Sequence, residues 1–83
     1  MGNYAVDIQA ALVTQVKAEM AVRDLRQKDV AERLGMQTST LSRYLSGRDI
    51  PVKVMFAIAD ALELPFVELV QRAERRLEAK DVL

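Results

Sequence analysis

Apolar residues recur at the spacing of α-helices along most of this chain. Residues 3–23 carry a broad apolar stripe made of Val6, Ile8, Leu12, Val13, Val16 and Met20. The stripe predicts one long helix, with Asn3 or Asp7 as the candidate N-cap. Two roles are open for it. The stripe packs on later helices as core, or its part before Leu12 projects and pairs with another subunit.

Two short helices joined by a tight turn are predicted in residues 27–47. The first covers residues 27–34, and its apolar positions share one face: Val30, Ala31 and Leu34. Gly35 then permits the left-handed backbone that ends a helix. We expect the apolar Met36 to fill the space under the turn.

The second short helix, over residues 38–46, has two unlike faces. Its apolar side is formed by Leu41, Tyr44 and Leu45. Its polar side is formed by Thr38, Ser39, Ser42 and Arg43, and Gly47 ends the helix. Hydroxyl residues are mediocre helix formers, so this face is a poor choice for a plain surface helix. It is well suited to contacts with base edges and phosphates.

Two more helices are predicted in the C-terminal part. Pro51 is expected in the first turn of the fourth helix, where its missing N–H is tolerated. The predicted inward face of that helix is Val54, Ile58, Ala59 and Leu62, with Met55 and Phe56 on its flank. Pro65 precedes a last helix over residues 66–81, whose apolar positions are Phe66, Leu69, Val70, Ala73 and Leu77. Its charged residues Glu68, Arg72, Arg76 and Lys80 predict a solvated face.

These segments resemble a known family. The residues Gln27, Ala31, Gly35, Leu41, Ser42, Gly47 and Pro51 stand at the positions typical of the helix-turn-helix of the lambda-repressor and Cro type. Residues 58–70 resemble that family's fourth helix and its short link to a fifth. The resemblance implies an all-α fold, a compact bundle of about five helices. It also implies that residues 1–83 form a single DNA-binding domain.

The chain departs from the family in two respects. Where many members pair an arginine with a glutamate, this chain has Met20 and Leu45. We therefore expect an apolar contact in place of the ion pair. Arg26 and Gln37 stand where relatives usually have Ser or Thr as N-caps, and neither is a favoured cap. Thr38 is the alternative cap, which leaves open whether Gln37 or Thr38 reaches the bases.

The resemblance and the residue types together indicate which residues contact DNA. Gln27 is expected to bind a backbone phosphate at the start of its helix and to brace the recognition helix. Arg43 is expected to bond guanine O6 and N7 together. The whole candidate set is Gln27, Gln37, Thr38, Ser39, Ser42, Arg43, Ser46, Arg48 and Lys53. The last three flank the end of the recognition helix, where relatives clamp the DNA backbone.

Composition limits the other functions. The chain has no cysteine and no histidine, so disulfides and the usual zinc ligands are missing and no cofactor is expected. No apolar run reaches the length of a membrane span, and the amino terminus does not resemble a signal peptide. We expect a cytoplasmic, nucleoid-associated protein without a membrane partner or an evident small-molecule ligand.

The charge is neutral overall but unevenly distributed. Twelve basic and twelve acidic residues cancel, whereas DNA-binding domains are commonly basic. Residues 26–53 carry six basic and three acidic residues, and Asp49 is the only acid between Gly35 and Lys53. The basic charge therefore lies where the resemblance expects DNA. The acidic remainder weakens nonspecific affinity and favours binding as a dimer.

The leading hypothesis is a sequence-specific regulator that binds double-stranded DNA, most simply a phage or bacterial transcriptional repressor. Its helix over residues 38–46 would read the major groove. We expect a homodimer that uses the last helix, residues 66–81, with or without the start of the first. The alternative is a helical adaptor or antitoxin-like module whose main partner is a protein. An enzyme is not expected, because the chain lacks histidine, cysteine and a phosphate-binding glycine loop.

Overall fold

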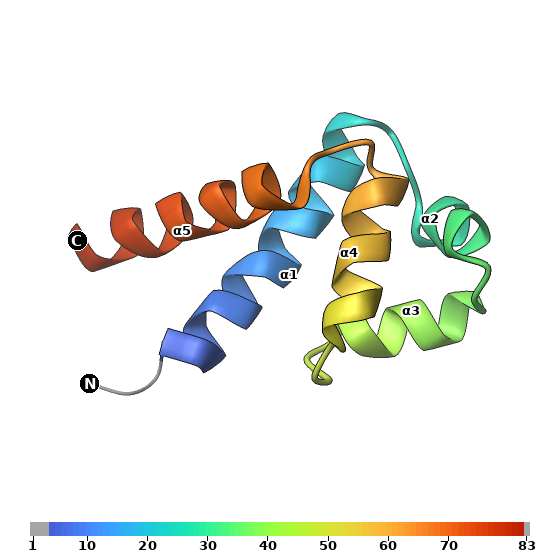
Figure 1. Cartoon of the computed structure of the whole chain (residues 1–83), viewed down its shortest axis with the longest axis horizontal. Coiled ribbons are helices and arrows are strands. Elements are labelled where there is room, and N and C mark those ends of the chain that lie inside the picture. The colour runs from blue at the N-terminus through green and yellow to red at the C-terminus, as the bar shows by residue number, and fades with distance from the viewer. Residues whose placement is uncertain (1–3, 83) are drawn as a thin grey trace.

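Five α-helices make up the structure, a computed structural model that describes the backbone of residues 4–82 and the side chains of residues 4–79. They are α1 (Tyr4–Val22), α2 (Gln27–Leu34), α3 (Thr38–Leu45), α4 (Val52–Ala61) and α5 (Phe66–Val82) (Figure 1). No strand occurs between residues 4 and 82, so the all-α fold class is confirmed. Asn3, one candidate N-cap, lies outside the described residues, and Asp7 lies within the first turn of α1.

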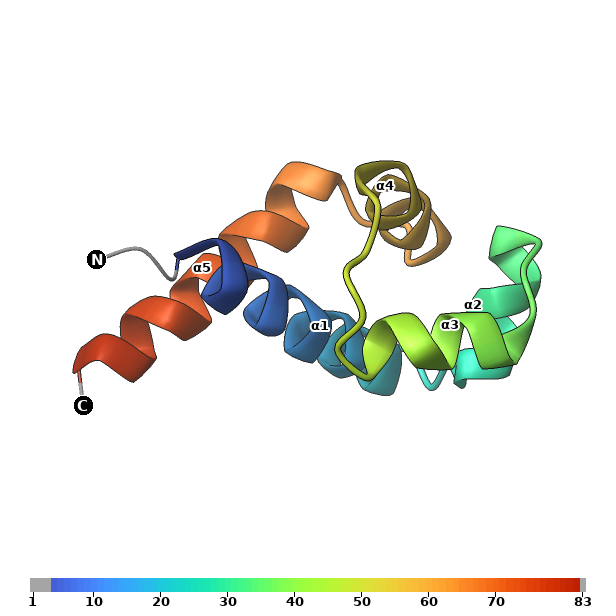
Figure 2. The ribbon, with the colours of Figure 1, turned by 90° about the horizontal axis from the view of Figure 1, so that it is seen from below.

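Helix α4 stands between two pairs of helices (Figure 1). On one side α1 and α5 pack along each other, and on the other side α2 packs on α3. Helix α4 contacts both pairs, through α2 and through α5. Seen from below, α3 runs along the outer edge of the molecule with one side uncovered (Figure 2). This arrangement leaves α3 open to a large partner.

One apolar core joins the helices. Its largest fully buried side chains are Leu41, Leu45, Ile58, Leu62, Leu69, Val16 and Val30. Burying one side chain of this kind contributes about 1.5–3 kcal/mol. Met20 and Leu45, at 6% and 2% exposure, belong to the same core. The apolar packing expected at these two positions in place of an ion pair is therefore found in the structure.

Three of the helices end in the same way. The backbone turns left-handed at Asp24 (φ 56°), Gly35 (φ 69°) and Glu63 (φ 55°), one or two residues after α1, α2 and α4 end. The next N–H then bonds back to a carbonyl five residues earlier, which closes the last turn. These bonds are Leu25 to Met20 (2.8 Å), Met36 to Ala31 (3.0 Å) and Leu64 to Ala59 (3.0 Å). Gly35 has the conformation expected of it, whereas Asp24 and Glu63 adopt one that glycine favours.

Four positions differ from the expectation drawn from the apolar pattern. Val6 is 70% exposed, because it lies on an open groove beside the end of α3. Met55 is buried in the core, whereas Phe56 is 49% exposed, so the two do not share one role on the flank of α4. Pro51 is the N-cap of α4 and lies just before its first turn. It needs no N–H there, and its carbonyl accepts the N–H of Met55 at 3.0 Å.

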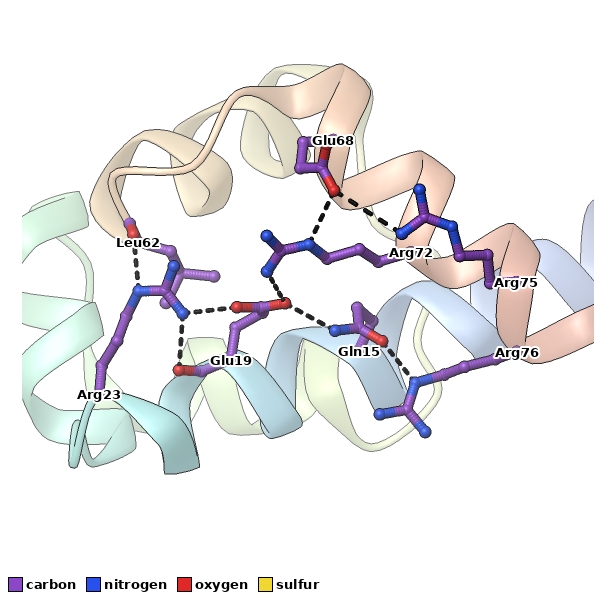
Figure 3. Close-up of polar contacts among 8 residues, drawn as sticks. All are labelled: Gln15, Glu19, Arg23, Leu62, Glu68, Arg72, Arg75 and Arg76. Atoms are coloured by element: carbon purple, nitrogen blue, oxygen red, sulfur yellow. Dashed lines mark hydrogen bonds and ion pairs between the residues drawn. The ribbon is translucent and has the colours of Figure 1, made fainter.

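The seam between α1 and α5 contains a buried carboxylate (Figure 3). Glu19 is 4% exposed and accepts hydrogen bonds from Arg72 Nη1 (2.7 Å), Gln15 Nε2 (2.6 Å) and Arg23 Nη1. Burial would raise the pKa of Glu19, but the hydrogen bonds from Arg72, Arg23 and Gln15 outweigh it and lower the pKa to about 2. Glu19 is therefore ionised and fully paired in the folded protein.

The predicted solvated face of α5 is wrong in part. Glu68 does pair with Arg72 at 2.9 Å, but Arg72 also reaches Glu19, and Arg76 donates to the Gln15 side chain. These arginines contact α1, because α5 lies along α1, while Arg76 remains exposed and Arg72 half-buried. The side chain of Lys80, placed on the same face, lies outside the described residues.

Candidate nucleic-acid interface

The position of α3 is fixed by its buried side. Leu41 and Leu45 are 0% and 2% exposed and anchor the helix in the core. The residues predicted to face DNA lie on the opposite side of the helix: Thr38, Ser39 and Arg43 are exposed and Ser42 is half-buried. Their spacing places them on one continuous face. The amphipathic pattern of this short helix therefore orients hydroxyls and one guanidinium outwards.

The start of α3 resolves the ambiguity between two capping residues. Gln37 is the N-cap, in extended conformation, and Thr38 is the first helical residue. Helix α3 therefore does not start one residue later with Thr38 as its cap. The Gln37 side chain makes no capping hydrogen bond, and no acidic residue lies in the first turn. The first backbone N–H groups of a helix have no acceptor within it, so this end of α3 favours an anion.

Helix α2 begins with a different arrangement. Arg26 is the N-cap, and its guanidinium carries only donors, so it cannot accept the helix N–H groups. Asp29 compensates in part, since its Oδ2 accepts the Arg26 backbone N–H at 2.9 Å. Gln27 is the first helical residue and is half-buried. The N–H groups of the first turn remain the anion-binding feature here, with Asp29 as a competing negative charge.

Three cations surround the far end of α3. Arg43 lies on α3, Arg48 in the loop that follows it, and Lys53 in the first turn of α4, and all three are exposed. In the part of the chain that the structure describes, none of them forms an ion pair. Unpaired cations on one edge can bind phosphates without first breaking an internal contact.

Ser46 is already engaged inside the protein. It is exposed and lies at the C-cap of α3, and its hydroxyl donates a hydrogen bond to the Ser42 carbonyl at 2.7 Å. A serine hydroxyl has one proton, so Ser46 can accept from DNA but must break this bond to donate to a phosphate. Of the predicted DNA contacts, the one from Ser46 to the DNA backbone is therefore the weakest, because as a donor Ser46 must first give up this internal hydrogen bond.

Two arginines have roles that the sequence did not indicate. Arg33, counted in the basic segment, donates from Nη1 to the Ala61 carbonyl at 2.6 Å. Arg23 donates from Nε to the neighbouring Leu62 carbonyl at 2.9 Å. Both thereby cap the C-terminus of α4, where the helix dipole is negative. No local signal identifies them, because their acceptors lie about 30 to 40 residues away along the chain.

Two other kinds of feature are absent from the described residues. Across these residues, no three histidine, cysteine, aspartate or glutamate side chains converge as metal ligands. None of the helices combines the length and the apolar character that crossing a membrane requires, within the same part of the chain. What the site presents is a row of hydroxyls, a free guanidinium and flanking cations.

Comparison with known proteins gives one match. The model of a family described as helix-turn-helix matches residues 16–69, which is more than half of the chain. The matched stretch runs from the middle of α1 into α5 and includes the whole of α2, α3 and α4. No curated protein and no solved structure matches the chain.

Proposed function

The chain belongs to the helix-turn-helix family of the Cro and C1 type, a family of DNA-binding regulators, and from this premise we propose that it is a sequence-specific transcriptional repressor. Helix α3 enters the major groove, which is about 12 Å wide and admits an α-helix. The protein acts by binding and carries out no catalytic step. Phage or bacterial DNA in the cytoplasm, within the nucleoid, is its proposed target.

The observation that carries this proposal is the uncovered face of α3. A short helix is held in the core by Leu41 and Leu45 while its outer face presents Ser39, Ser42 and Arg43. Arg43 is the proposed guanine contact, because a guanidinium can donate to O6 and N7 together. Ser39 and Ser42 are short, so they support only a close approach of the helix to the bases.

The remaining residues are proposed to position the protein on the DNA backbone. The free N–H groups at the start of α2 and α3, with Gln27, Gln37 and Thr38, would bind phosphates on one side. Arg48 and Lys53, with Ser46 as the weaker member, would bind them beyond the other end of α3. Contacts of this kind fix register and supply affinity without reading sequence.

We infer that the repressor binds as a homodimer. Apolar side chains are exposed near the junction of α4 and α5, where Phe56 (49% exposed) stacks edge-on against Phe66 with ring centroids 4.7 Å apart. Val67, the next residue of α5, is 66% exposed. An interface here uses the start of α5 and leaves α3 free. Two copies of α3 would then read half-sites about 34 Å apart, one turn of DNA.

Selection from a pool of random DNA duplexes tests the proposed function directly. A repressor of this kind should enrich one pseudo-palindromic sequence whose half-sites are centred about 10 base pairs apart. Failure to enrich any sequence, at low salt and over several rounds, would contradict the proposal. It would favour the alternative, a helical adaptor or antitoxin-like module that binds a protein. The neutral net charge and the amphipathic α1 and α5 support this alternative.

A further inference from the structure

A groove of about 630 Å³ lies between the first half of α1 and the end of α3. Its α1 wall includes Val6, Ala10 and Val13, and Leu45 lines the α3 side. Gln9, Ser46 and Asp49 supply its polar side chains. Ligand sites typically measure about 300–1,000 Å³ and combine an apolar lining with few polar groups. The groove has a volume and an apolar lining of this kind, and of the candidate DNA-binding residues only Ser46 is among its described lining residues.

The α1 wall of this groove belongs to the part of the chain outside the family match. The match begins at Val16, whereas the α1 residues that line the groove lie between Ala5 and Val13. These first turns do not serve only to complete the core, since Val6 remains 70% exposed. The groove is thus a feature of this chain's own α1, built beside a shared helix-turn-helix.

The charged group of the groove is a carboxylate. Among the described residues, Asp49 is the one charged residue in its lining, and the nearest cation in sequence, the exposed Arg48, does not line it. Among the described residues Asp49 has no ion pair, and its side chain accepts only a long hydrogen bond of 3.3 Å from Gln9 Nε2. The groove is also lined by Leu45, the last residue of α3, and by Ser46 and Gly47, which follow it. The C-terminus of α3 therefore adds the negative end of a helix dipole to the groove. A cation is the complementary occupant.

A second copy of the chain does not fit this surface groove to groove. A two-fold symmetric contact centred on the groove would face it with the same groove of the partner copy. It would bring Asp49 towards another Asp49 with no lining base to balance either of them. The apolar lining also separates this site from a simple inorganic cation site, which takes several oxygen ligands.

We propose that the groove binds a small organic cation, an ammonium or guanidinium that carries an apolar body. The apolar body lies against Val6, Ala10 and Leu45, and the charged end pairs with Asp49 in place of the Gln9 amide. A long, exposed hydrogen bond is easily replaced by a charged donor, which bonds more strongly.

Such a ligand would also influence DNA binding, a consequence that rests on the proposed function. Asp49 lies next to Arg48 in sequence and between the cations that face phosphates. Pairing Asp49 with a cation removes a negative charge from the neighbourhood of DNA, so the ligand should tighten DNA binding. Linkage requires that DNA tighten ligand binding by the same factor, which we expect to be about twofold to fivefold.

Benzylammonium titrated into the whole chain, followed by NMR at constant ionic strength and without DNA, tests the site itself. Saturable shifts should be confined to the methyl groups of Val6, Ala10, Val13 and Leu45. The neutral analogue benzyl alcohol should bind about twofold to fivefold more weakly, the factor expected for one exposed ion pair. Shifts scattered over the surface, or none that saturate, would overturn the proposal whether or not the protein binds DNA.

Matched variants separate the two parts of the site. Asp49→Asn keeps an acceptor for Gln9 and should abolish the preference for benzylammonium over benzyl alcohol. Val6→Ser should weaken both ligands about equally, while Val22→Ser, at an 83% exposed valine near the other end of α1, should change neither. An unchanged preference in Asp49→Asn, in protein whose thermal unfolding matches the wild type, would rule out Asp49 as the cation partner.

Discussion

Glu19 on α1 and Arg72 on α5 are joined by an ion pair of 2.7 Å, although they lie 53 positions apart along the chain. The Glu19 carboxylate is buried and also bound by Gln15 and Arg23. A buried charge with all its partners in place holds two helices in one register, whereas an apolar contact tolerates sliding. The position of α5 therefore depends on this pair. So does the position of the exposed apolar surface at the start of α5.

Glu19→Gln should destabilise the protein by about 2–3 kcal/mol at neutral pH, because it leaves two arginines facing a neutral group. The loss should depend on pH. The folded-state pKa of about 2 is below the ordinary value of 4.5, so the ionised carboxylate stabilises the fold above pH 4.5. That contribution disappears as the pH falls from 4.5 towards 2. Urea unfolding of the wild type and the variant at pH 7, 4.5 and 3 should show the difference between them shrinking.

Glu68→Gln is the matched control for this prediction. Glu68 also pairs with Arg72, but its side chain is 34% exposed, so the change should cost less than about 1 kcal/mol. Equal losses in the two variants would mean that burial of Glu19 has no special effect. A difference between wild type and Glu19→Gln that does not change with pH would argue against the lowered pKa.

Glu63→Gly should stabilise the fold by about 0.5–1 kcal/mol. Glu63 holds a left-handed φ of 55° after α4, which costs a residue with a Cβ about 1–2 kcal/mol, and part of the gain is offset because glycine is freer when unfolded. Thermal unfolding should show a rise of about 3–6 °C. Glu63→Gln is the control for the loss of the carboxylate. It keeps the strained backbone and should leave the melting temperature unchanged.

Gly35→Ala is the converse change. A Cβ at Gly35 would meet no atom within 4 Å, so the left-handed φ of 69° is the only source of strain. We expect a loss of about 1 kcal/mol. A neutral outcome would show that the turn between α2 and α3 relaxes to another backbone conformation.

Val67→Lys should break the proposed dimer. A lysine placed among exposed apolar groups at the start of α5 must lose water on association, so the dimer should weaken about tenfold to thirtyfold. Val6→Lys is the control, because Val6 is 70% exposed in the first part of α1 and lines the groove, which the proposed dimer does not use. Sedimentation equilibrium measures both. If the wild-type protein stays monomeric at micromolar concentration, with and without DNA, the proposed homodimer is wrong.

Much of the fold could be predicted because its information is local. The periodic apolar residues, Gly35 and Pro65 mark the helices and their ends, and helix bounds such as Gln27–Leu34 follow from them. The all-α class and the family resemblance drew on the same signals. The sequence leaves the exact start of α3 open between Gln37 and Thr38 as N-cap, and the structure places the cap at Gln37.

The long-range polar contacts could not be predicted in this way. In the sequence, Glu19 is one polar residue on a mostly apolar helix, and its immediate neighbours do not indicate that it is buried. The signal that existed was weak: Gln15, Glu19 and Arg23 share a helix face, as do Glu68, Arg72 and Arg76 on the last helix. Only the packing of α5 along α1 makes the two faces meet. The exposure of Val6 likewise depends on what lies opposite it.

The most direct test of the central claim compares Arg43→Ala with Lys53→Ala on the selected duplex and a scrambled one. Each variant removes one exposed cation that has no ion pair within the described residues. Fluorescence anisotropy across a salt series gives the affinity and its salt slope. Arg43→Ala should cost about 1–3 kcal/mol on the selected duplex only, whereas Lys53→Ala should weaken both duplexes and reduce the slope by about 1. Equal effects of Arg43→Ala on both duplexes would contradict the claim that α3 reads DNA sequence.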